Sequence, residues 1–149
     1  MLGTLTEHEI DNLLVSQSVG RIGCTDGKKP YIIPVTYSYN GKNIIGQTRE
    51  GMKLDIIRKN PNVCFEVDAM ASMNNWKSVV VSGTFRELGG EEAEKAREYL
   101  FGCVLTLMTN SAVHKHEHEE VSEVDDSNRI KPVMYQIEIT EKTGRFERQ

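Results

Sequence analysis

Residues 46–53, Gly-Gln-Thr-Arg-Glu-Gly-Met-Lys, combine residue types that can bind a phosphate group. The segment follows a predicted strand and opens a predicted helix, where backbone N–H groups are free and the helix dipole attracts negative charge. Thr48 adds a hydroxyl donor, and Arg49 and Lys53 add positive charge. A phosphate monoester would suit this set; the alternative is a capped helix start with two solvated cations. Met52 stands where a Walker A loop needs its lysine, which disfavours an ATPase.

A second segment could contact a flat ligand. Trp76 is the only tryptophan of the chain and lies just before a predicted strand, among polar neighbours. In an extended chain, Trp76 and Ser78 point to the same face. The indole ring could stack on a ligand or close an interface. The alternative is a tryptophan of the core or of a dimer interface.

A proline interrupts the strand-like run 31–39. Pro34 cannot donate a ladder hydrogen bond, so we expect it at an edge, a bulge or a bend. Neighbouring backbone groups, near Val35 and Thr36, would then lack ladder partners and could hydrogen-bond a planar heterocycle. The alternative is a plain edge strand without a ligand.

Three histidines, His114, His116 and His118, alternate within the acidic stretch 111–127. An extended chain would place them on one face, where neutral imidazoles could bind zinc. Their spacing matches no standard zinc site, so a solvated acidic loop is the favoured interpretation and we predict no metal site. No serine stands in a nucleophile-elbow context, so the sequence assigns no catalytic residues.

The elements that would position these residues favour an antiparallel barrel. A Thr6–Glu9 capping box opens a first helix that Gly20 is predicted to end, and hydrophobic spacing predicts further helices over 54–59 and 91–109. Strands are predicted at 21–25, 31–39, 43–47, 62–67, 78–88 and 132–143. The polar stretch 68–75 is predicted as a loop. Because the connections are mostly hairpin-like, a barrel fits better than a doubly wound parallel sheet.

Length and composition indicate a single domain spanning residues 1–149. A net charge of −4 and 7% aromatic residues argue against nucleic acid as a partner. The cysteines, Cys24, Cys64 and Cys103, are far apart, which favours free buried thiols in a reducing compartment. The N-terminus has no signal-peptide pattern, and no stretch approaches the ~20 apolar residues of a membrane span. We therefore expect a cytoplasmic protein that does not bind membranes.

The order of the motifs resembles a known family. They run Gly20-Arg21-Ile22-Gly23, Pro30-Tyr31-x-x-Pro34-Val35-x-Tyr37, Gly51-Met52-Lys53, Asn60-Pro61-x-Val63-Cys64-Phe65, Trp76-Lys77-Ser78-Val79, Gly83-Thr84-Phe85 and Pro132-Val133-Met134-Tyr135. Over residues 6–145 the chain is similar to the pyridoxamine 5′-phosphate oxidase-like, FMN-binding split-barrel family. It looks closest to the branch that includes the nitroimidazole-resistance (Nim) proteins.

This resemblance implies a mainly β fold, a six-stranded antiparallel Greek-key split barrel. It also implies a homodimer with two FMN molecules in clefts between the subunits. One strand would run along the isoalloxazine ring, the segment before the second helix would grip the phosphate, and two residues would reach FMN from the other subunit. In that order, the implied cofactor-binding residues are Pro34, Val35, Thr36 and Tyr37, then Gln47, Thr48, Arg49 and Lys53, then Trp76 and Ser78.

The function that the resemblance implies is an FMN-dependent oxidoreductase. Its substrate would be a small electron acceptor, nitroaromatic or quinone-like, with NAD(P)H as a candidate reductant. The alternative is a non-enzymatic flavin-binding or sensing protein. The chain departs from many members of this branch at Gln47, where they carry a histidine. A glutamine cannot carry charge, ligate a haem or donate a proton as histidine would. No residue matches pyridoxal phosphate handling, so the strict oxidase activity is not expected.

Overall fold

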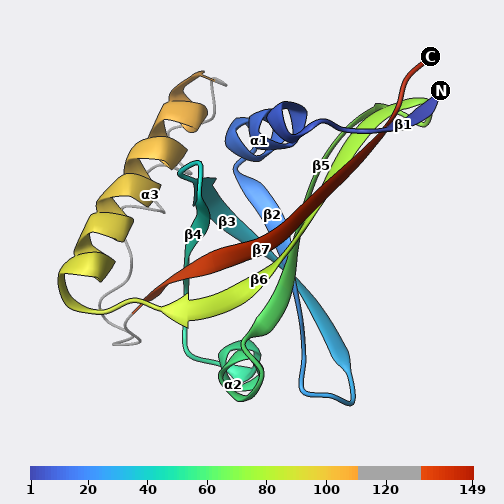
Figure 1. Cartoon of the computed structure of the whole chain (residues 1–149). Helices are drawn as coiled ribbons and strands as arrows, with labels where there is room; N and C mark the ends of the chain where they lie inside the picture. The colour runs from blue at the N-terminus through green and yellow to red at the C-terminus, as the bar shows by residue number, and fades with distance from the viewer. Residues whose placement is uncertain (111–131) are drawn as a thin grey trace.

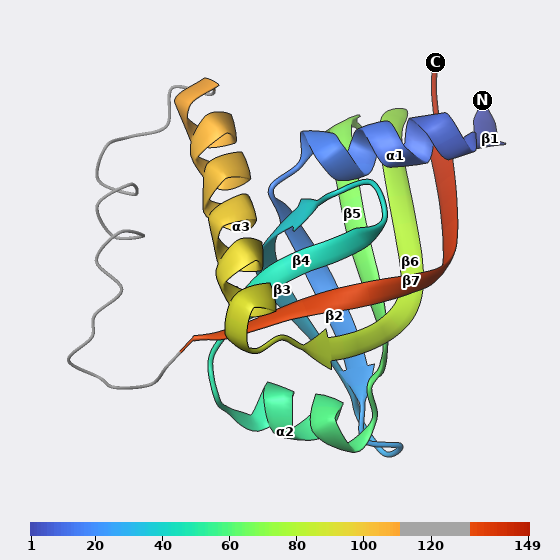
Figure 2. The same cartoon turned by 60° about the vertical axis from the view of Figure 1, so that its left-hand side comes forward.

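Six strands wind into a closed antiparallel barrel in the computed structural model of the chain (Figures 1 and 2). The structure describes residues 1–110 and 132–149, with only the helical backbone over 104–110. In chain order the elements are β1 (Leu2–Thr4), α1 (Glu7–Ser16), β2 (Val19–Thr25), β3 (Pro30–Tyr39), β4 (Asn43–Thr48), α2 (Met52–Lys59), β5 (Asn62–Ser72), β6 (Asn75–Glu87), α3 (Gly90–Asn110) and β7 (Val133–Glu147). The predicted mainly β barrel with inserted helices is confirmed.

The barrel closes because β7 pairs with both β4 and β6. The strand order is β7-β4-β3-β2-β5-β6, and the β6–β7 ladder joins its two ends. The predicted meander of three consecutive strands is the run β2-β3-β4. The short strand β1 was not predicted, and it adds to the end of β7. Closure pairs the strand edges, which would otherwise be open to other chains.

The barrel is split beside the first half of β3. Residues 30–36 pair with β2, whereas the ladder with β4 covers only residues 37–39. Pro34 therefore lies on a stretch with a single ladder neighbour among the described strands, where a proline is tolerated. An edge is one of the three positions that the sequence allows for this proline.

Apolar side chains from the barrel and two helices form the main core. At one end of the barrel α1 inserts Leu13 and Leu14, and at the other α2 inserts Leu54 and Ile57 (Figures 1 and 2). Each such side chain stabilises the fold by about 1.5–3 kcal/mol on burial. The long helix α3 packs outside the barrel, against β3, β4 and β7. In the described part of the chain, no helix is long and apolar enough to cross a membrane.

Two predicted boundaries were wrong. Residues 68–75 form the end of a β5–β6 hairpin rather than a loop, and the ladder continues past a register shift to the Ser72–Asn75 pair. The first helix ends at Ser16, and Gly20 lies in β2 instead. A Cβ at Gly20 would come within 2.2 Å of the Phe65 ring, so close strand packing explains this glycine.

Candidate functional site

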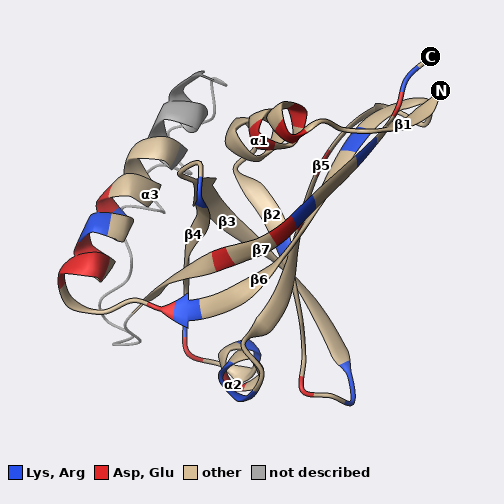
Figure 3. Ribbon diagram, in the orientation of Figure 1, with Lys and Arg blue, Asp and Glu red and all other residues tan. Residues whose placement is uncertain are grey.

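The segment predicted to bind phosphate connects β4 to α2. Thr48 ends the strand and Met52 begins the helix. Gly51, the N-cap residue, has extended backbone (φ 166°) and provides no side-chain cap. The first N–H groups of a helix have no intrahelical partner, so those of α2 remain available to an anion. Figure 3 shows the basic residues on this helix.

Lys53, in the first turn of α2, is a half-buried cation. Burial lowers the pKa of its ammonium group, an effect opposed by the proximity of Cys24. Arg49, three residues after Gly46, is exposed. No ion pair of the described residues involves either cation. A bound anion would supply the missing counter-charge, since burial disfavours an unpaired cation.

Thr48 is buried, and its Oγ1 atom has no hydrogen-bond partner among the described residues. Such an unpartnered group costs about 1–3 kcal/mol, which a ligand acceptor could recover. Adjacent strand residues face opposite sides, so Gln47 lies on the face of β4 shared with Ile45, which packs against α3. Its Oε1 atom is buried and unpartnered too. Thr48, Arg49 and Lys53 therefore fit a phosphate group.

The predicted ring-contacting residues of β3 divide between its two faces. Pro34 and Thr36 are exposed, and Val35 is buried in the core. Tyr37 is fully buried, and its hydroxyl donates to the backbone carbonyl of Leu14 at 2.6 Å. Burial also raises the pKa of Tyr37. The Tyr37 ring is thus part of the core, whereas the exposed side chains border the split in the barrel.

The start of β6, which carries Trp76 and Ser78, lies at the other end of the barrel from α2 (Figures 1 and 2). The Trp76 indole N–H donates to Glu147 Oε1 at 3.3 Å, and the Ser78 hydroxyl donates to Glu66 Oε2 at 3.2 Å. Burial, together with the neighbouring Asp68, raises the pKa of the Glu66 carboxyl. Within one chain, these two residues are not brought together with the segment 48–53.

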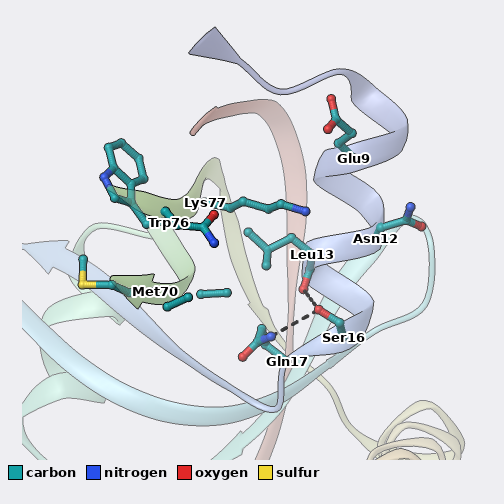
Figure 4. Close-up of a pocket in the computed structure, with 11 residues that line it drawn as sticks. Glu9, Asn12, Leu13, Ser16, Gln17, Met70, Trp76 and Lys77 are labelled. Carbon is teal, nitrogen blue, oxygen red and sulfur yellow. Dashed lines mark hydrogen bonds between the residues drawn. The ribbon is translucent and has the colours of Figure 1, made fainter. Parts of the chain in front are cut away.

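Trp76 borders an open groove of about 580 Å³ between α1 and the β5–β6 hairpin. Leu13 and Asn12 line it from α1, and Lys77 extends across it toward that helix (Figure 4). The indole of Trp76 points away from α1 (Figure 4). The half-buried Trp76 ring is therefore not covered by α1.

Sequence reasoning missed Arg58, which holds Glu50 and Glu87 beside the candidate site. Local spacing gives no signal for this group, because Glu87 comes from a strand far along the chain. It also missed Tyr135, a fully buried residue whose hydroxyl lies over Gly46 without a partner among the described residues.

The remaining candidates add no second site to the described residues. His114, His116 and His118 lie outside them. The searched residues contain no group of three or more potential metal ligands. The cysteines are free, as the sequence predicts, but the prediction that they are buried is wrong for Cys64. Cys24 is buried and Cys64 exposed, because adjacent strands present them to opposite faces of the sheet.

The fold defines the class as an antiparallel split barrel, and comparison with known proteins identifies the family. A family model described as pyridoxamine 5′-phosphate oxidase matches residues 6–146. The chain belongs to this family. An uncharacterized protein of Rhizobium meliloti (strain 1021) is 33% identical over 84 residues, which cover 56% of this chain and 56% of that protein.

Solved structures show the same fold. A FAD-binding protein from Mesorhizobium loti is 25% identical, with a TM-score of 0.79 over 100% of this chain and 98% of that one. A protein described as a 5-nitroimidazole antibiotic resistance protein, from Bacteroides thetaiotaomicron, is 15% identical, with a TM-score of 0.70 over 98% and 89%. A FAD-binding protein from Mycobacterium smegmatis is 24% identical, with a TM-score of 0.62 over 97% and 98%.

Proposed function

We propose that the protein binds FMN, with the phosphate held at the start of α2. The observation that carries this proposal is the uncapped helix start, beside the half-buried Lys53 and the unpartnered Thr48 hydroxyl. The phosphate monoester of FMN carries close to two negative charges, which match Lys53 and Arg49. The FAD-binding relative from Mesorhizobium loti supports a flavin as the ligand class.

The flavin ring would lie along the open edge of β3. Thr36 and Pro34 are exposed there, and residues 30–36 keep one side of the strand without a ladder partner among the described strands. Backbone groups near Val35 would hydrogen-bond the heterocycle. A bound flavin would supply the electron transfer, and the protein would supply position and electrostatics. In this proposal Tyr37 supports the strand from within the core.

A homodimer would complete the site. The outer face of β2, β5 and β6 exposes Val19, Met70 and Val80. Because Trp76 and Ser78 lie far from α2 on their own chain, a partner subunit would have to bring them to the flavin. Exposed apolar residues on an open sheet face are typical of an interaction surface.

The protein would act as an oxidoreductase on a small nitroaromatic or quinone-like acceptor, with NAD(P)H as the reductant. This substrate class follows from the sequence resemblance. A non-enzymatic flavin carrier or sensor is the second candidate. It is favoured by the composition of the site, where the described residues supply cations and hydroxyls, and where two of the nearby carboxylates, Glu50 and Glu87, are paired with Arg58. Steady oxidation of NAD(P)H with an acceptor would exclude the second candidate.

Flavin binding is tested by absorbance of the purified protein and by reconstitution with FMN, FAD and riboflavin. We expect FMN to bind about 10–100-fold more tightly than riboflavin, the equivalent of one charge-assisted phosphate contact. Tighter binding of FAD than of FMN would overturn the monoester assignment. A colourless protein that takes up none of the three would overturn the proposed function.

A further inference from the structure

Arg58 ties the candidate phosphate segment to the barrel through two carboxylates. Its Nη1 and Nη2 atoms donate to the two oxygens of Glu50 at 2.7 and 2.8 Å. Its Nε and Nη2 atoms donate to the two oxygens of Glu87 at 3.1 and 2.7 Å. One guanidinium therefore connects the loop before α2, the last turn of α2 and the end of β6. Both carboxylates are gripped in a two-point geometry that a lysine could not reproduce.

This connection acts on a loop with little other support. Gly51 provides no side-chain cap, and the backbone bond that fixes the helix start runs from Asp55 N–H to the Gly51 carbonyl at 3.1 Å. Glu50 makes its hydrogen bonds with Arg58 alone among the described residues. The hydrogen bonds from Arg58 lower the pKa of the Glu50 carboxyl, so it stays ionised at neutral pH.

We propose that Glu50, Arg58 and Glu87 form a positioning clamp that holds residues 48–53 in the geometry that binds the flavin phosphate. This inference rests on the proposed function. The clamp touches no ligand itself. It acts by fixing the loop between Thr48 and Lys53. The three side chains are 38–51% exposed, so we expect breaking the clamp to reduce FMN affinity without abolishing binding.

Replacing Glu50 gives a test in which a positioning role and a simple charge effect predict opposite changes in FMN affinity. Glu50 is an anion next to a site for an anion. On charge alone, Glu50→Gln would strengthen FMN binding by removing repulsion. If the clamp positions the loop, Glu50→Gln instead weakens FMN binding by about fivefold, the effect of losing one surface ion pair.

A second substitution, at Arg58, keeps the positive charge and removes the paired hydrogen bonds of the guanidinium group. Arg58→Lys leaves the net charge unchanged but cannot hold two carboxylates by parallel hydrogen bonds. We expect it to weaken FMN binding by about the same factor as Glu50→Gln. The matched controls are Glu94→Gln and Arg97→Lys, which make the same chemical changes in an ion pair on α3. We expect the controls to leave flavin binding unchanged.

The measurement is the dissociation constant for FMN and for riboflavin, from quenching of flavin fluorescence at fixed salt. Riboflavin lacks the phosphate. If the clamp positions the phosphate segment, the substitutions weaken the binding of FMN and leave the binding of riboflavin unchanged. An equal loss for both ligands, or tighter FMN binding by Glu50→Gln, would overturn the clamp. If the unsubstituted protein binds FMN no better than riboflavin, the phosphate site of the proposed function fails, and the clamp fails with it.

Discussion

Lys53 carries a positive charge into a half-buried position where the described residues supply no counter-ion. Its neighbour in space is the buried thiol of Cys24, whose own pKa is raised by burial. A neutral thiol gives the ammonium group no charge compensation. An anionic ligand at the start of α2 would therefore gain from both the charge and the free backbone N–H groups.

Replacing Lys53 tests this residue directly. We expect Lys53→Ala to weaken FMN binding by about 1.5–3 kcal/mol, the range for a hydrogen bond to a charged group. Isothermal titration calorimetry or fluorescence quenching would measure the change. Lys59→Ala, on the exposed last turn of the same helix, is the matched control and should bind FMN normally. Equal affinity of both variants would show that the phosphate lies elsewhere.

At the scale of elements, α1 is fastened to the barrel by a polar group as well as by its apolar face. Lys142 of β7 donates to Asp11 Oδ1 at 2.7 Å, and the Tyr39 hydroxyl donates to the same oxygen at 2.9 Å. Burial raises the pKa of the Asp11 carboxyl, but these hydrogen bonds outweigh it and hold the pKa below its usual value. Ionised Asp11 therefore stabilises the docking of α1.

The pH dependence of stability follows from this shift. A carboxyl whose pKa is lowered by folding contributes fully above its unfolded pKa of about 3.9 and loses its contribution as pH falls through the folded value. We expect Asp11→Asn to lower the free energy of unfolding by about 1 kcal/mol at pH 7, after allowance for solvent screening. The difference from the unsubstituted protein should shrink as pH falls below the unfolded value and through the lower folded value.

Urea unfolding at several pH values would measure this difference. Asp55→Asn, at an exposed position of α2, is the control and should show little difference at any pH. A deficit for Asp11→Asn that persists unchanged in acid would mean that the ion pair is not its cause.

Sequence patterns predicted elements where one face is buried and the signal is local. The buried residues Leu54 and Ile57 identified α2, and the order of residues 46–53 identified the candidate site. The end of the β5–β6 hairpin was not predicted as strand, because its residues beyond Asp68 are mostly exposed and do not alternate between apolar and polar. The contact between Arg58 and Glu87 escaped because it joins residues 29 positions apart, which only the barrel brings together.

At the scale of the whole molecule, the exposed face of β2, β5 and β6 is the surface through which we propose that two chains associate. A charge placed at its centre should oppose association, because burying an unpaired carboxylate is costly. If the chain forms the proposed dimer, we expect Val80→Asp to convert it to monomers and to reduce flavin retention. Sedimentation velocity with absorbance at the flavin wavelength would report both properties.

The matched control is Val15→Asp, which places the same charge at another exposed valine, on α1. It should leave both association and flavin content unchanged. If Val80→Asp remains a dimer that retains its flavin, the subunits associate through a different surface.

The distance along the barrel between Trp76 and the start of α2 has a thermodynamic consequence. If one flavin contacts both regions, it must contact them on different chains, so ligand binding and chain association are linked equilibria. Excess flavin would then favour the assembled form, and dilution of the protein would release flavin as the chains separate. The apparent affinity for the cofactor would depend on protein concentration, as a site contained within a single chain would not.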